Sequence, residues 1–167
     1  AVQHADNTIK HHIREDGSTF HVVDFDDKGN VTWKGTRQGY SDASTWTRGQ
    51  AWGIYGFTIT YRETKQVKYL KTAIELADYF IEHLPDDMVP YSDFQAPNIP
   101  ECEKDASAAA IAASALLELN GYVSSKAYDV VAERMLAALS GESYSAKNTD
   151  YESVLRRASS WYSGYEK

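Results

Sequence analysis

An arginine lies between two tryptophans in the segment 44–57. Trp46 and Arg48 are two positions apart, whereas Arg48 and Trp52 are four apart and share one face of a helix. A guanidinium can bind a carboxylate through two parallel hydrogen bonds, and an indole offers a flat apolar surface to a pyranose ring. This spacing indicates a site for an anionic sugar. An equally acceptable interpretation is an aromatic-rich core helix, with Arg48 in a structural ion pair.

Composition excludes several other kinds of partner. The chain has 167 residues, of which 43% are apolar, and this suits one domain with a core of its own. A formal charge of -7 argues against nucleic acid and against an anionic membrane surface. No stretch is apolar for long enough to span a bilayer. A small anionic substrate is not excluded, because it meets the pocket and not the net charge.

Residues that could support other chemistries are poorly placed. The single cysteine, Cys102, rules out an internal disulfide, and the neighbouring Glu101 and Glu103 oppose thiolate formation. His11 and His12 are adjacent, so their rings point apart on a helix and make a poor metal site. There is no Gly-rich phosphate loop and no Ser-His-Asp arrangement. We therefore expect no metal and no cofactor.

The positions of apolar residues predict helices in antiparallel pairs and one inserted β-hairpin. A helical pattern already runs from the first residue to about 14, without a start methionine, so the chain opens inside an element. The expected strands cover 18–25 and 30–33, and the later helices cover about 45–62, from Thr64 to just before Pro85, 106–119, and from Ser124 or Ser125 to about 139. A proline-rich loop is expected over 86–103, and a short strand over 153–157.

Several side chains are expected to begin these helices. Ser44 or Asp42 should cap the central helix, Thr64 the next one and Asp105 the alanine-rich one. Asp93 lies in the long loop, where an Asx-type turn is the simplest role. Asp42 is close enough in sequence to approach the site, but a structural role at the positive end of the helix is favoured.

Three segments carry a resemblance to a known family. Segment 44–57 reads Ser-Thr-Trp-Thr-Arg-Gly-Gln-Ala-Trp-Gly-Ile-Tyr-Gly-Phe and resembles the signature of the unsaturated glucuronyl hydrolases, glycoside hydrolase family 88. Segments 89–100 and 105–114 also resemble this family, and the resemblance extends over nearly the whole chain. The unsaturated rhamnogalacturonyl hydrolases, which have an Arg-Gly-Asn-Gly-Trp version, fit less well but remain an alternative.

The resemblance implies an all-α fold, the (α/α)6 barrel, in which six helical hairpins form a ring. Only about four helices and a fragment are visible in the sequence. We therefore expect an incomplete barrel of antiparallel helical hairpins with one inserted β-hairpin. Residues 1–167 would then be the C-terminal part of a single barrel domain, with its N-terminal half absent.

The implied activity is hydrolysis of unsaturated (Δ4,5) glucuronyl oligosaccharides, the products of polysaccharide lyases. A carboxylic acid protonates C4 of the vinyl ether, oxygen adds at C5, and the hemiketal collapses. In the family, two aspartates from the N-terminal half carry this chemistry. Neither of their segments has a match here, so we expect no catalytic residue in this chain.

The implied binding residues are better represented. By motif, His21 matches a histidine that faces the sugar, and Thr36 and Gln38 match the loop before the signature. Arg48 and Trp52 match the residues that contact the uronate and stack on its ring.

A last segment concerns sulfate. Ser160 and Ser163 match two serines of a Ser-x-x-Ser-x-Lys stretch that meets a sulfate on the second sugar in some members. Tyr165 replaces the lysine, with Lys167 two positions on, so the sulfation preference stays open.

Two rival functions also stay open, a non-catalytic uronide-binding fragment and a helical-repeat interaction module. The partner expected besides the small unsaturated uronide is the missing half or another chain. The compartment, cytoplasmic or periplasmic, and the oligomeric state are undetermined.

Overall fold

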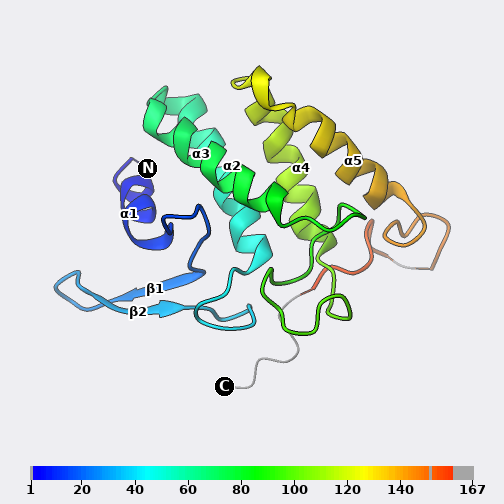
Figure 1. Cartoon of the computed structure of the whole chain (residues 1–167), viewed down its shortest axis with the longest axis horizontal. Coiled ribbons are helices and arrows are strands. Elements are labelled where there is room, and N and C mark those ends of the chain that lie inside the picture. The colour runs from blue at the N-terminus through cyan, green and yellow to red at the C-terminus, as the bar shows by residue number, and fades with distance from the viewer. Residues whose placement is uncertain (1, 151, 160–167) are drawn as a thin grey trace.

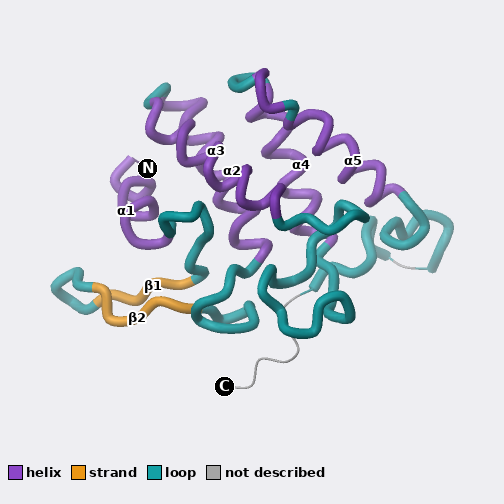
Figure 2. The backbone as a smooth tube through the Cα atoms, in the orientation of Figure 1, coloured by secondary structure: helices purple, strands orange, loops and turns teal. Residues whose placement is uncertain are grey.

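The computed structural model describes residues 2–150 and 152–159. This part of the chain is mostly helical, with five α-helices and a small two-stranded sheet (Figures 1 and 2). In chain order the elements are α1 (Val2–His12), β1 (Val22–Phe25), β2 (Val31–Gly35), α2 (Thr47–Thr64), α3 (Val67–Glu82), α4 (Ala106–Asn120), the 3-10 helix η1 (Ser124–Lys126) and α5 (Tyr128–Ser140).

Helix α2 lies at the centre of the core. It packs against α3 and α4, and α5 packs against α4 (Figure 1). The apolar stripe of α3 is buried, with Tyr69, Leu76 and Phe80 fully enclosed, and each such side chain contributes about 1.5–3 kcal/mol on burial. The alanine-rich face of α4, including Ala109 and Ala112, is also buried. Small side chains there let α4 lie close to α2.

The predicted hairpin is confirmed, with different bounds. Strands β1 and β2 are antiparallel, and Val22 pairs with Gly35. Residues 18–21 do not belong to β1 because they fold back on the end of α1, where the backbone N–H of Phe20 donates to the carbonyl of His12 at 2.7 Å. Asp26 closes the turn by accepting from the backbone N–H of Asn30 at 2.7 Å.

The prediction that Ser44 or Asp42 caps α2 is wrong. Trp46 stands at the N-cap position and makes no side-chain cap bond. Ser44 instead donates its hydroxyl to Oδ2 of Asp93 at 2.6 Å. Asp42 accepts the backbone N–H of Thr36 at 3.1 Å. Ser44 is held by the long loop before α4 and Asp42 by the loop after β2, so neither reaches the first turn of α2.

Thr64 does not begin the next helix either. It is the last residue of α2, and its hydroxyl donates to the carbonyl of Thr60 at 2.6 Å. Lys65 follows in the left-handed conformation, with φ of 55°. This residue turns the chain, and α3 therefore starts after Gln66.

Two later expectations also need correction. Helix α5 begins at Tyr128 rather than near Ser125, because Ala127 has a left-handed φ of 50° that separates η1 from α5. Over 153–157 the structure has only an isolated bridge between Leu155 and Ser145, in place of a strand. In residues 2–150 and 152–159, no helix is long and apolar enough to cross a membrane.

Candidate functional site

A groove of about 370 Å³ lies between α1 and α2, beside the start of the hairpin. Its walls are mostly apolar and aromatic, and in the described part of the chain no aspartate or glutamate lines it. The lining residues are His4, Ala5, Thr8, His12, Ile13, Thr19, Phe20, His21, Trp46, Gly49, Trp52, Gly53, Gly56, Phe57, Thr60 and Leu76. Two residues predicted for the site, His21 and Trp52, thus come together on this groove.

Trp52 lies on α2 with 51% of its surface exposed. Its ring meets the ring of Tyr55 edge to face, with 5.8 Å between the centroids. A large aromatic ring that is half exposed on a groove wall is available to stack on a ligand. Trp46, at the start of α2, is buried and forms another part of the wall.

His21 stacks on Trp46, with 4.2 Å between the ring centroids. Its Nδ1 atom lies 3.0 Å from the hydroxyl oxygen of Thr36. The backbone N–H of Arg37 also donates to Nδ1, at 3.3 Å. The ring is therefore held on one face by an indole and on one edge by the loop that follows β2.

The environment of His21 disfavours a positive charge. Burial is the largest cause, and it is joined by the positive charges of His12, Arg37 and Arg48. Together they lower the pKa of His21 from 6.5 to about 4. At neutral pH this side chain is an uncharged imidazole.

The loop between β2 and α2 carries Thr36 and Gln38. Thr36 is 1% exposed, so its side chain lies beneath the surface, whereas Gln38 is partly exposed. Asp93, fully buried in the long loop, holds this segment by accepting from the backbone N–H of Tyr40 at 2.9 Å and from the hydroxyl of Ser44. Sequence reasoning gave Asp93 only a local turn, because partners some fifty positions away leave no local signal.

The local turn of Asp93 is confirmed as well. Its other oxygen, Oδ1, accepts the backbone N–H of Gln95 at 2.9 Å, the bond expected of an Asx-type turn.

Arg48 faces the N-terminus of α4. Its Nε donates to Oδ2 of Asp105 at 2.9 Å, and the guanidinium carbon lies 5.1 Å from the ring centroid of Trp46. Asp105 is fully buried and caps α4, as predicted, by accepting from the backbone N–H groups of Ser107 and Ala108. The structural ion pair considered for Arg48 is therefore present. Within residues 2–150 and 152–159, the Nη2 atom of Arg48 is buried without a hydrogen-bond partner.

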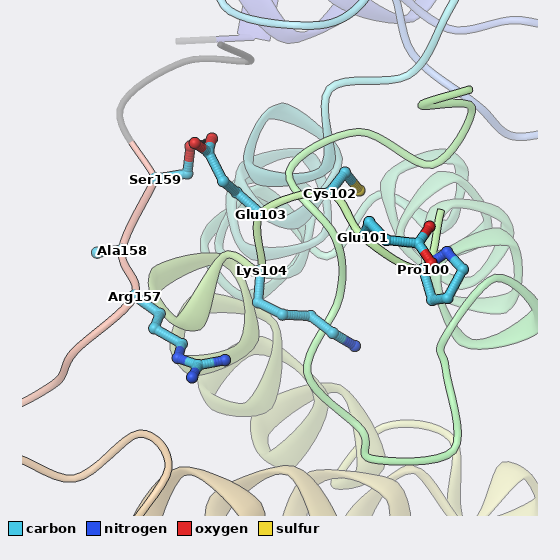
Figure 3. A pocket seen from close by; sticks show the side chains of 8 residues that line it. All are labelled: Pro100, Glu101, Cys102, Glu103, Lys104, Arg157, Ala158 and Ser159. Atoms are coloured by element: carbon cyan, nitrogen blue, oxygen red, sulfur yellow. Dashed lines mark hydrogen bonds between the residues drawn. The ribbon is translucent and has the colours of Figure 1, made fainter. Parts of the chain in front are cut away.

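A second hollow, of about 630 Å³, lies where the described chain ends. One side is formed by residues 100–104 and the other by Arg157, Ala158 and Ser159 (Figure 3). Both signs of charge meet here, because Lys104 and Arg157 lie beside Glu101 and Glu103. The predicted sulfate contacts Ser160 and Ser163 follow directly in sequence, but they lie outside the described residues.

Cys102 contributes to this hollow. It is buried, and burial raises the pKa of its thiol to about 11. This supports the expectation that Cys102 is a poor nucleophile, although burial and not the charge of Glu103 is the main cause. Among the described residues there is no group of three or more metal-ligating side chains.

Comparison with known proteins gives a consistent result, although no family model matches the chain. The unsaturated glucuronyl hydrolase of Formosa agariphila is 49% identical over 152 residues, which cover 89% of this chain and 38% of the relative. The unsaturated chondroitin disaccharide hydrolase of Streptococcus pyogenes serotype M1 is 37% identical over 98% of this chain and 43% of the relative. The crystal structure of an unsaturated glucuronyl hydrolase specific for heparin superimposes with a TM-score of 0.92 and 38% identity, covering 96% of this chain and 44% of that chain.

The chain is therefore a homologue of hydrolases that act on glycosides. Within that class it belongs with the unsaturated glucuronyl hydrolases, as the resemblance of segment 44–57 predicted. It spans less than half the length of the curated relatives that it matches.

Proposed function

We propose that this chain is the substrate-binding part of an enzyme that hydrolyses unsaturated (Δ4,5) glucuronyl oligosaccharides by hydrating the vinyl ether. One observation carries the proposal: His21 and the half-exposed Trp52 line an aromatic groove together with Trp46, whose ring centroid lies 5.1 Å from the guanidinium carbon of Arg48, in a chain 49% identical to an unsaturated glucuronyl hydrolase. The ligand is a small unsaturated uronide.

The proposed binding roles follow from the chemistry of the side chains. Arg48, with 20% of its side chain exposed, binds the uronate carboxylate through Nη1, since its Nε is taken by Asp105 and its Nη2 is buried. Trp52 stacks on the sugar ring, and Gln38 and His21 hydrogen-bond its oxygens. Thr36, which is buried, acts through the loop rather than by direct contact.

The acid and base of the reaction come, in this proposal, from the part of full-length relatives that lies outside the matched segment. Hydration needs a protonated carboxyl group at C4 and an ionised one nearby. No carboxylate of the described chain lines the groove. Asp93 and Asp105 are fully buried and accept internal hydrogen bonds with both oxygens, so neither is available for proton transfer.

A second part of the proposal concerns the domain to which the chain belongs. We infer that residues 1–167 form part of one (α/α)6 barrel, whose remaining helices complete the groove from the open side. The supporting observation is the TM-score of 0.92 over 44% of the length of a glucuronyl hydrolase chain. The sulfate contacts of Ser160 and Ser163 remain a prediction from sequence.

An activity assay of this chain tests the proposal. The chain is mixed with unsaturated chondroitin disaccharide, binding is measured by calorimetry, and turnover is followed by the ultraviolet absorbance of the conjugated double bond. We expect binding without turnover, and turnover when the chain replaces the matching segment of the Formosa agariphila hydrolase.

The other outcomes are informative. Loss of absorbance at enzymatic rates with the chain alone would mean that a catalytic carboxylate pair lies within these residues, with Asp42 the first suspect. Binding without turnover in the hybrid would favour a non-catalytic uronide-binding protein. Absence of binding in every form would favour the helical-repeat interaction module.

A further inference from the structure

The edge of the His21 ring that faces the protein accepts hydrogen bonds. The backbone N–H of Arg37 points at Nδ1 over 3.3 Å. A backbone amide can only donate, so this contact requires a lone pair on Nδ1. At 3.3 Å it is long for an N–H hydrogen bond, and by itself it holds the ring only weakly in the state with the proton on Nε2.

The hydroxyl of Thr36 reinforces this state. Its oxygen accepts the backbone N–H of Gly39 at 2.8 Å, and it lies 3.0 Å from Nδ1 of His21. With the ring proton on Nε2, the hydroxyl donates its own proton to Nδ1. The two hydrogen bonds therefore have a fixed direction: the N–H of Gly39 donates to the hydroxyl of Thr36, and that hydroxyl donates to Nδ1 of His21.

The opposite edge of the ring carries Nε2. Within the described residues, no hydrogen-bond partner is present for Nε2 of His21, while the ring itself lines the groove and stacks on Trp46. The groove is thus presented with one N–H donor of defined position.

We propose that Thr36 is a positioning residue that locks His21 as the neutral Nε2–H tautomer, so that His21 donates one hydrogen bond to a hydroxyl or carboxylate oxygen of the bound sugar. The choice of a sugar as ligand rests on the proposed function, whereas the tautomer lock stands on the geometry of this chain. Thr36, which is 1% exposed, then influences the ligand only through His21.

The charges around His21 agree with a neutral donor. The groups that act on it are basic, His12 from α1, Arg37 from the loop and Arg48 from α2, and together with burial they lower its pKa. In the chain without ligand, a second positive charge beside Arg48 is therefore disfavoured. In this arrangement Arg48 contributes the positive charge, and His21 contributes a neutral hydrogen-bond donor at a fixed position.

Nitrogen NMR measures the tautomer directly. The chain is labelled with ¹⁵N-histidine, and the His21 signals are identified by their loss in His21→Gln. We expect a proton on Nε2 and none on Nδ1 throughout the neutral range. In Thr36→Val, which keeps the side-chain shape, the two tautomers should mix, and Thr36→Ser should restore the original pattern. A proton on Nδ1 in the unaltered chain, or an unchanged pattern in Thr36→Val, would overturn the lock.

Binding of unsaturated chondroitin disaccharide measures the consequence. Thr36→Val should weaken binding roughly 2- to 12-fold, the value of one net hydrogen bond. The matched control is Thr58→Val, because Thr58 is also 1% exposed but bonds only to the carbonyl of Ile54 in its own helix. Equal affinities for the two variants would contradict the role of Thr36. Failure of every form to bind the sugar, with the tautomer as expected, would remove the sugar as acceptor and count against the proposed function alone.

Discussion

Arg48 Nε and Asp105 Oδ2 lie 2.9 Å apart, which joins the signature helix α2 to the first turn of α4. The carboxylate is fully buried, while 20% of the arginine side chain is exposed. Oδ1 of Asp105 caps α4, and Oδ2 orients the guanidinium. One side chain therefore begins a helix and sets the direction of the cation proposed to bind the uronate.

Replacing Asp105 should separate these two roles. Asp105→Ala removes both the cap and the ion pair, and because the pair is largely buried we expect a loss of about 3–5 kcal/mol in the free energy of unfolding. Asp105→Ser retains a cap, so it should be about 1 kcal/mol more stable than Asp105→Ala. Urea unfolding measures both variants. Sugar affinity should fall in Asp105→Ser, because Arg48 loses the carboxylate that orients its guanidinium. An affinity equal to that of the wild type would show that Arg48 does not need Asp105 in order to bind the sugar.

Asp93 should control the order of the loop at 36–46. In Asp93→Ala, the backbone N–H groups of Tyr40 and Gln95 lose a buried acceptor, while the hydroxyl of Ser44 keeps the carbonyl of Ser41. Each orphaned donor costs about 1–3 kcal/mol, so we expect a loss of about 2 kcal/mol or more and faster amide exchange in the loop. Asp27→Ala, at an exposed position in the hairpin turn, is the control and should change stability by less than about 0.5 kcal/mol. Unchanged exchange in Asp93→Ala would contradict this role.

Trp52 should matter for the ligand and little for the fold. Its side chain is half exposed, so Trp52→Ala removes little buried area from the core. Lost stacking should weaken sugar binding by about 0.5–1.5 kcal/mol, or roughly 2- to 12-fold, in calorimetric titration. Val67→Ala on α3, at a site 59% exposed and away from the groove, should leave the affinity unchanged. A large drop in stability without a change in affinity would place Trp52 in the core instead.

The low pKa of His21 predicts the direction of a pH effect. In the unfolded chain this histidine titrates near its ordinary value, about 6.5, and in the folded chain at about 4. Between these values the unfolded state binds more protons, so the stabilisation is fully present above about pH 6.5 and is lost as the pH falls toward 4. His21→Gln should flatten the dependence of the unfolding free energy on pH in this window. Parallel curves for the two proteins would refute the shifted pKa.

Helical periodicity and small residues were enough to predict most elements. Apolar spacing located α2, α3 and α4, because a buried face must repeat at the helical period. The cap Asp105 was also predicted, since it acts on residues next to it in sequence. The predictions that Ser44 and Thr64 cap helices were wrong. The hydroxyl of Ser44 donates to Asp93, which is remote in sequence, and the hydroxyl of Thr64 donates to the carbonyl of Thr60, one turn back in the same helix.

The sequence by itself determined the helical class, the hairpin, the family resemblance and the residue types of the site, all of which depend on local patterns. Only the tertiary structure decided which of those residues meet: His21 and Trp52 share the groove, whereas Thr36 lies beneath it and Arg48 pairs with Asp105. The physical reason is that hydrogen-bond partners and burial are set by chain segments tens of residues apart, and no spacing within one segment encodes them.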